Sequence, residues 1–174
     1  MRALEAGPLW PYAKNFNLYH CPGDTRDTRK CGDGYAWVTY SKSQNYGGDP
    51  SGDYWGMGAT IAKMSDATSP ANTFLMAEDT DSRGIDVNTW VVEWITGTPN
   101  FTWVDPLGMY HIDANTWSFA DGHALAHVWT GQQIIQAGLG AAEGLATFYF
   151  DGPTSGPDYL YVQEHLRFPG WKQE

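Results

Sequence analysis

The segment YHIDANTWSFADGHALAHVW, which starts at Tyr110, carries three of the chain's five histidines and two of its acids. His111, Asp121 and His123 offer imidazole and carboxylate groups, which are ligands that zinc and related transition metals take in proteins. Asp113 is a further member of this mixed set. The alternative is structural, because His111 can instead hydrogen-bond Asp121 or the backbone of the turn and so fix a hairpin against its neighbour.

Glu78, from another part of the chain, offers a further carboxylate group. It can join the mixed metal site, or it can pair with Asp121 as the two carboxylates that flank a sugar in glycoside cleavage. The chain has no Gly-x-Ser-x-Gly, His-Glu-x-x-His or phosphate-loop motif, so the enzyme families that those motifs mark gain no support. The candidate catalytic residues are Glu78, Asp121, His111 and His123, without an assigned role.

The acidic segment EDTDSRGID, residues 78–86, has the composition of a calcium loop. Calcium takes hard oxygen ligands, and carboxylates at alternate positions before a glycine turn can point at one centre. The expected metal ligands are Glu78, Asp79, Asp81 and Asp86. The predicted cofactor is therefore Ca²⁺. The alternative is a solvated turn whose acids bind nothing, because the segment falls short of a complete EF-hand loop.

Nine tryptophans are many for a chain of 174 residues. Planar aromatic rings in loops or on a sheet can stack on sugar rings, so Trp55, Trp94 and Trp103 are candidate ligand-binding residues for a polysaccharide. The alternative is that these side chains fill the core, where most tryptophans lie at least partly buried.

Cys21 and Cys31 stand in the segment CPGDTRDTRKC with nine residues between them. A disulfide across this spacing would close a small loop and stabilise the fold by about 2–3 kcal/mol, mainly by restricting the unfolded chain. A two-cysteine metal site is the competing interpretation, although the cysteines of such pairs usually stand two to four residues apart. We expect the Cys21–Cys31 disulfide, in an oxidising compartment.

The candidate residues lie on a chain whose pattern is mainly that of β-strands. Aromatic and β-branched residues predict strands at 35–41, 69–79 and 88–97, and the segment 116–129 has the pattern of a hairpin. Residues 131–148 form the only stretch with a helical pattern, and interior glycines weaken it by about 1 kcal/mol each. The expected fold is one α+β domain, mostly β, built on an antiparallel sheet with long loops.

The dipeptide Asp-Gly before His123 sets the predicted register of the hairpin, because it is a strong signal for a two-residue turn. Such a turn places Phe119 opposite Ala124 and makes Trp117 part of an apolar face. His123 and His127 then share the other, wetter face. They lie about 13 Å apart by strand rise, so one metal cannot bind both.

Several of these residues together resemble a known family. His111, nine intervening residues and Asp121-Gly122 resemble the carboxy-terminal motif of bacterial pseudopilin-like proteins with a prepilin-type processing-associated H-X9-DG domain. The segments LWPYAKNFNLYHCPGD, TYS and SPANTFLMAED look like that family's tyrosine-to-Cys-Pro-Asp segment, its Tyr-Ser strand and its Pro-to-Glu strand. The likeness covers about residues 9–129. It departs from the family at Tyr110, where arginine is common, and the family's amino-terminal helix with its processing signal is not in this sequence.

The resemblance implies the head domain of a type II secretion pseudopilin-like protein, in which a sheet packs behind a long helix and the role is structural. It implies an extracellular or periplasmic location, with other pilin-like subunits as partners of a longer parent protein. Related major pseudopilins bind calcium in loops near the carboxy terminus, which agrees with the predicted Ca²⁺. Residues 1–174 then form a single pseudopilin-like head domain, and we expect a further amino-terminal segment in the parent.

Charge and hydropathy narrow the range of partners. Ten Lys and Arg against twenty Asp and Glu give a net charge of −10, so no basic surface is expected for nucleic acid or anionic membranes. No run approaches the roughly 20 apolar residues that span a bilayer, so no membrane segment is expected in this chain. The alternative function is a secreted glycan-active domain, either carbohydrate-binding or a small glycoside hydrolase with paired carboxylates.

Overall fold

The computed structural model describes residues 2–31, 33–47, 55–80, 89–145 and 149–172. Its strands are β1 (Tyr40–Ser43), β2 (Phe74–Glu78), β3 (Thr89–Trp90), β4 (Val92–Trp94), β5 (Phe101–Trp103), β6 (Ala114–Phe119) and β7 (Ala124–Val128). Its helices are α1 (Arg2–Glu5), α2 (Gln132–Ala142), α3 (Pro157–His165) and short 3-10 helices at Phe16–Tyr19, Thr25–Thr28, Gln44–Tyr46, Met64–Asp66 and Pro70–Asn72. Of the described residues, 27% are helical and 20% lie in strands, which confirms the α+β class but not a predominance of β.

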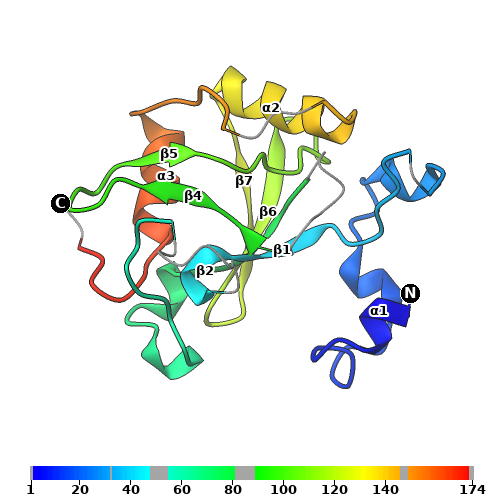
Figure 1. Ribbon diagram of the computed structural model, residues 1–174, viewed down its shortest axis with the longest axis horizontal. Coiled ribbons are helices and arrows are strands. Elements are labelled where there is room, and N and C mark those ends of the chain that lie inside the picture. Colours follow the sequence, from blue (N-terminus) through cyan, green and yellow to red (C-terminus); the bar gives the residue numbers. More distant parts are fainter. Residues whose placement is uncertain (1, 32, 48–54, 81–88, 146–148, 173–174) are drawn as a thin grey trace.

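Two sheets form the centre of the fold (Figure 1). The larger has the strand order β3-β1-β2-β6-β7, and the smaller pairs β4 with β5. β1 runs antiparallel to β2 but parallel to β3, so the larger sheet is mixed and not purely antiparallel as expected. The parallel pair is possible because a long connection separates β1 from β3, whereas β6 and β7 are joined directly by a hairpin.

The β6–β7 hairpin forms, but its register differs from the prediction by one residue. Trp117 lies opposite Leu125, and the N–H of Phe119 donates to the carbonyl oxygen of His123. The turn therefore holds three residues and ends at Gly122, whose φ of +96° is the left-handed value that closes such turns with a bulge. A shift of one residue exchanges the two faces of a strand.

The register shift changes the surroundings of the hairpin histidines. Leu125 and His127 share the face of Trp117, which is the core side of the sheet. His127 stacks on Tyr161 of α3 with 3.7 Å between ring centroids, so the predicted wetter face for this histidine is wrong. His123 stacks on the ring of a buried phenylalanine of β6 at 4.2 Å.

The core lies between the larger sheet, α3 and the smaller sheet. Phe74 of β2 stacks on Trp117 of β6 with 3.9 Å between ring centroids, and both side chains are fully buried. Tyr161 and His165 of α3 lie within 5.3 Å and 5.2 Å of the Phe74 ring, again centroid to centroid. The centre of the sheet is therefore fixed by aromatic stacking.

The two longer helices differ in how far the sequence predicted them. α2 lies inside the predicted helical stretch 131–148 and approaches the β5–β6 loop closely at Gly138, where an added Cβ would lie 2.3 Å from the carbonyl oxygen of Leu107. α3 was not predicted, because the sequence around it is rich in glycine and proline. Pro157 nevertheless suits the first turn of a helix, where its missing N–H is not needed.

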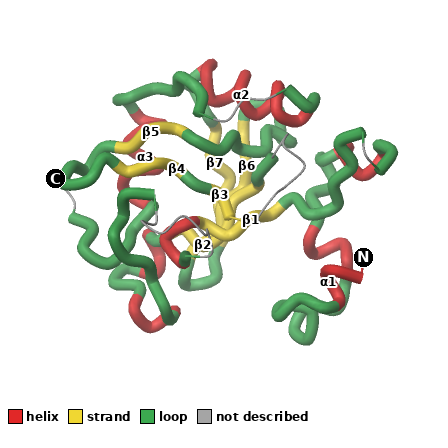
Figure 2. The backbone as a smooth tube through the Cα atoms, viewed as in Figure 1, coloured by secondary structure: helices red, strands yellow, loops and turns green. Residues whose placement is uncertain are grey.

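The amino-terminal segment, residues 2–39, stands to one side of the sheets and is mostly loop (Figure 2). It lies against the outer face of the larger sheet, where Leu9, Tyr40 and Met76 line two hollows of about 400 and 430 Å³. This segment delivers Cys21 to the end of β2, where it meets other polar side chains.

Candidate functional site

Three potential ligands from distant parts of the chain meet at one end of the larger sheet. Cys21 comes from the amino-terminal segment, Glu78 ends β2, and His111 stands in the loop between β5 and β6. Cys21 and His111 are 90 positions apart in the sequence. One ligand atom from each of the three side chains nevertheless lies within 4.8 Å of the others, so the fold creates a cluster that no short motif contains.

Both the thiol and the carboxylate approach the same nitrogen of the imidazole. His111 Nε2 lies 3.1 Å from Glu78 Oε1 and 3.4 Å from Cys21 Sγ. The other carboxylate oxygen, Glu78 Oε2, accepts the N–H of Thr116 at 2.6 Å, which orients the carboxylate. Glu78 and Cys21 are buried, whereas 45% of the His111 side chain is exposed, so the cluster opens to solvent on the histidine side.

A buried polar network holds Cys21 in place. The Cys21 N–H donates to Thr39 Oγ1, and the Thr39 hydroxyl donates to Asp24. Asp24 also accepts a hydrogen bond from the Arg26 guanidinium at 2.8 Å, and both side chains are buried. Burial acts to raise the pKa of Asp24, but the hydrogen bonds and charge of Arg26 outweigh burial and lower that pKa.

The electrostatics of the cluster do not favour a free thiolate. Burial first, and then the hydrogen bond to Glu78, raise the pKa of Cys21 to about 11. Tyr40, which pairs with Glu78 in the sheet, has a pKa raised to about 12, by burial first and then by the charges of Glu78 and Cys21. Nucleophilic cysteines have lowered pKa values, so these surroundings by themselves do not activate Cys21.

The geometry also differs from that of a catalytic relay. In such a relay one imidazole nitrogen faces the nucleophile and the other faces the orienting carboxylate. Here Nε2 of His111 faces both Cys21 and Glu78. Three groups that converge on one point are arranged to bind a cation or to share hydrogen bonds, and not to pass a proton along a chain.

The mixed site predicted around the hairpin divides into two separate groups. His111 joins Glu78, whereas the ring of His123 bonds Asp121 Oδ1 at 2.6 Å in the exposed turn. The backbone N–H of His123 also donates to Asp121 Oδ1, and these bonds hold the pKa of Asp121 below its usual value. The predicted hydrogen bond between His111 and Asp121 is therefore replaced by one that is local to the turn.

Glu78 and Asp121 do not form a pair of catalytic acids. The turn that holds Asp121 lies beside Thr73, because the Ala120 N–H donates to the Thr73 carbonyl. Thr73 is five residues from Glu78, which is roughly 16 Å along a strand. The two carboxyl groups of glycosidases lie within about 10 Å of each other, so the glycosidase pair predicted from the sequence is wrong.

The predicted calcium loop lies only partly within the described residues. Asp81 and Asp86 fall outside them. Glu78 is turned toward the imidazole of the cluster, whereas the charge of Asp79 acts on Arg26. The two predicted calcium ligands that the structure describes thus serve different neighbours, and calcium at this loop stays a prediction.

The predicted disulfide between Cys21 and Cys31 is not formed, and both cysteines are free. Cys21 is buried and points toward His111, while Cys31 is exposed. The 3-10 helix Thr25–Thr28 lies between them, and its capping residue Asp24 belongs to the network that holds Cys21 inward. The loop is therefore fastened by a buried ion pair instead of a covalent bond.

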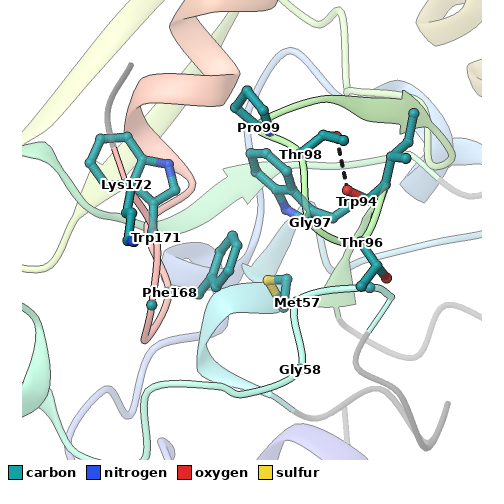
Figure 3. A pocket seen from close by; sticks show the side chains of 13 residues that line it. Met57, Gly58, Trp94, Thr96, Gly97, Thr98, Pro99, Phe168, Trp171 and Lys172 are labelled. Atoms are coloured by element: carbon teal, nitrogen blue, oxygen red, sulfur yellow. Dashed lines mark hydrogen bonds between the residues drawn. The ribbon is translucent and has the colours of Figure 1, made fainter.

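The three tryptophans predicted to bind sugars have different surroundings. Trp103 lies in the hydrophobic core, so it is not available to a ligand and that prediction is wrong. Trp55 is half-buried. Trp94 is largely buried as well, but it forms part of the wall of a cleft of about 530 Å³ together with Phe168 and Trp171 (Figure 3).

Comparisons of the chain with protein-family models, with curated proteins and with solved structures give no match. Within the part of the chain that the structure describes, no helix is long and apolar enough to cross a membrane. The sequence indicated Glu78 and His111 as members of one mixed site but assigned Cys21 to a disulfide. No spacing signal could have joined Cys21 to the other two, because only the folded sheet brings these segments together.

Proposed function

We propose that this chain is the extracellular or periplasmic head domain of a pilin-like protein, with a structural role in an assembly of such subunits. The support is one observation about the residues that carry the resemblance. Cys21 of the Cys-Pro segment, Glu78 at the end of the Pro-to-Glu strand and His111 of the H-X9-DG motif converge in space. These three residues belong to motifs of the family that the sequence resembles. They are distant in the sequence but meet in the fold, which favours a shared structural role.

The second half of the motif fits the same proposal. Asp121 accepts hydrogen bonds from His123, and Gly122 supplies the positive φ that the turn needs. The nine intervening residues include all of β6, which runs from the cluster at one end to the turn at the other. Motif residues that stabilise the two ends of one strand favour a structural role for the motif. The residues of a catalytic motif would instead lie together around a substrate.

Cross-linking in the cells that make the protein tests this proposal. Single cysteines are placed at the exposed positions Tyr12, Ile112 and Val128 in a Cys31→Ser background, and a mild oxidant is added. We expect covalent multimers from at least one position, in the fraction sheared from the cell surface. The Cys31→Ser protein alone is the matched control, because its remaining thiol, Cys21, is buried. Monomers at all three positions would overturn the proposal.

A second candidate function, glycan binding, is favoured by the aromatic cleft of Figure 3. Phe168 and Trp171, which are half-buried, give its wall a flat apolar surface on which sugars can stack, and the largely buried Trp94 also lines the cleft. The buried indole N–H of Trp94 has no acceptor among the described residues. Tryptophan fluorescence during titration with a panel of polysaccharides tests this function. Trp171→Ala should abolish a response that the distant Trp10→Ala retains, and no response in the parent protein would refute it.

A further inference from the structure

The cluster of Cys21, Glu78 and His111 has the dimensions of a metal site. A tetrahedral zinc ion with sulfur at about 2.3 Å and imidazole nitrogen at about 2.0–2.1 Å holds those two atoms about 3.6 Å apart. Its nitrogen and carboxylate oxygen ligands lie about 3.3–3.4 Å apart. The protein places Cys21 Sγ 3.4 Å and Glu78 Oε1 3.1 Å from His111 Nε2, so both edges need to open only slightly.

A positive charge would stabilise this cluster, because its ligand atoms are largely buried. The carboxylate residue Glu78 is 0% exposed, and the neighbouring thiol residue Cys21 is 1% exposed. Buried anionic groups are stable when they are paired or when they coordinate a metal. His111 forms a salt bridge with Glu78 only if it is protonated, and the guanidinium of Arg26 is already engaged by Asp24. A divalent cation at the centre would instead place two positive charges beside all three ligands and favour the thiolate form of Cys21.

Backbone N–H groups around the cluster form hydrogen bonds with two of the three ligands. The N–H of Gly23 points at Cys21 Sγ at 3.4 Å, and the N–H of Thr116 donates to Glu78 Oε2. Such outer hydrogen bonds orient metal ligands and stabilise their anionic forms. Gly23 has no space for a side chain, because a Cβ there would lie 2.6 Å from the carbonyl oxygen of Tyr110.

We propose that Cys21, Glu78 and His111 bind one zinc ion, with water at the fourth position on the exposed side of the histidine. Zinc accepts sulfur, nitrogen and oxygen ligands together, whereas calcium and magnesium take oxygen ligands. The ion would fasten the amino-terminal segment to β2 and to the β5–β6 loop, in place of a disulfide. This site is independent of whether the protein assembles into a pilin-like structure.

Thiol protection in the full chain tests the proposal directly. The Cys31→Ser variant leaves Cys21 as its only thiol. After the protein is stripped with a chelator, zinc is added in steps while alkylation of Cys21 is followed under native conditions. We expect one equivalent of zinc to slow alkylation at least tenfold, millimolar calcium to leave the rate unchanged, and mass spectrometry to find one zinc per chain. An alkylation rate that saturating zinc does not change would overturn the proposal.

Ligand variants then show whether the other two residues take part. His111→Gln and Glu78→Gln should each weaken zinc binding at least tenfold, and Asp121→Asn, in the distant turn, is the matched control that should bind zinc like the parent. Cobalt in place of zinc should give a thiolate-to-metal absorption band that Cys21→Ser lacks. Parent-like zinc affinity in both His111→Gln and Glu78→Gln would refute the assignment. If these variants do not fold, the thiol-protection result alone decides the question.

Discussion

Asp158 offers a sharp test of how the helices are joined to the hairpin. It is the second residue of α3 and is 4% exposed. Its Oδ2 accepts the N–H of Thr130 at 2.9 Å and of Gly131 at 2.6 Å, and Gly131 is the residue that precedes α2. Its Oδ1 lies 3.2 Å from Nε2 of His127 on β7. One carboxylate of α3 therefore holds the two residues that lead into α2 and contacts the edge strand of the larger sheet.

The expected loss for Asp158→Ala follows from these contacts. A hydrogen bond to a charged group contributes about 1.5–3 kcal/mol, and a buried N–H left without an acceptor costs about 1–3 kcal/mol. Because neighbouring contacts are not additive, we expect a total loss of about 3–5 kcal/mol in the free energy of unfolding. In a chain of this length such a loss lowers Tm by roughly 6–20 °C. Asp151→Ala, at an exposed position, is the control and should change stability by less than about 0.5 kcal/mol.

The same carboxylate should leave a signature in the pH dependence of stability. Burial acts to raise the pKa of Asp158, but hydrogen bonds from Gly131, Thr130 and His127 outweigh burial and lower it. The stability that it contributes is therefore present above the unfolded pKa of about 3.9 and is lost as the pH falls through the lower, folded pKa. Urea unfolding at pH 7 and at pH 3 should show a larger difference for the parent than for Asp158→Asn. A parent-like urea midpoint for Asp158→Ala at pH 7 would refute this role of the Asp158 carboxylate.

Four further substitutions test the core, the close contacts and the cysteines. Phe74→Ala removes a fully buried ring and should cost about 3–5 kcal/mol in urea unfolding, whereas a loss below about 1 kcal/mol would contradict the packing of the sheet. Gly138→Ala should lower Tm more than Gly122→Ala, because its Cβ meets the Leu107 carbonyl, while at Gly122 only the positive φ costs about 1–2 kcal/mol. Equal losses would count against a close approach of α2. Cys31→Ser should leave Tm unchanged, and a large decrease would show that a disulfide forms in solution.

The elements that could be predicted are those whose signals lie within a short stretch of sequence. The apolar run that ends at Glu78 forms β2, the Asp-Gly dipeptide lies in the β6–β7 turn, and the helical stretch 131–148 contains α2. Strand and turn propensities act over a few residues, so these features do not need the rest of the fold. α3 was not predicted because its stability depends on residues distant in the sequence. One of them is Phe101, on which Tyr159 stacks with 4.3 Å between ring centroids.

The sequence by itself determined the kinds of groups that this protein carries: an Asp-Gly turn, two cysteines, five histidines and many aromatic rings. The tertiary structure decided which of them meet. The hairpin adopts the register that places His127 on the core side, where it contacts Tyr161 and Asp158 of α3. Cys21 likewise reaches Glu78 only because burial of the apolar faces brings the amino-terminal segment to the end of β2. Contacts of 3–4 Å between distant segments depend on this packing, which no local pattern in the sequence records.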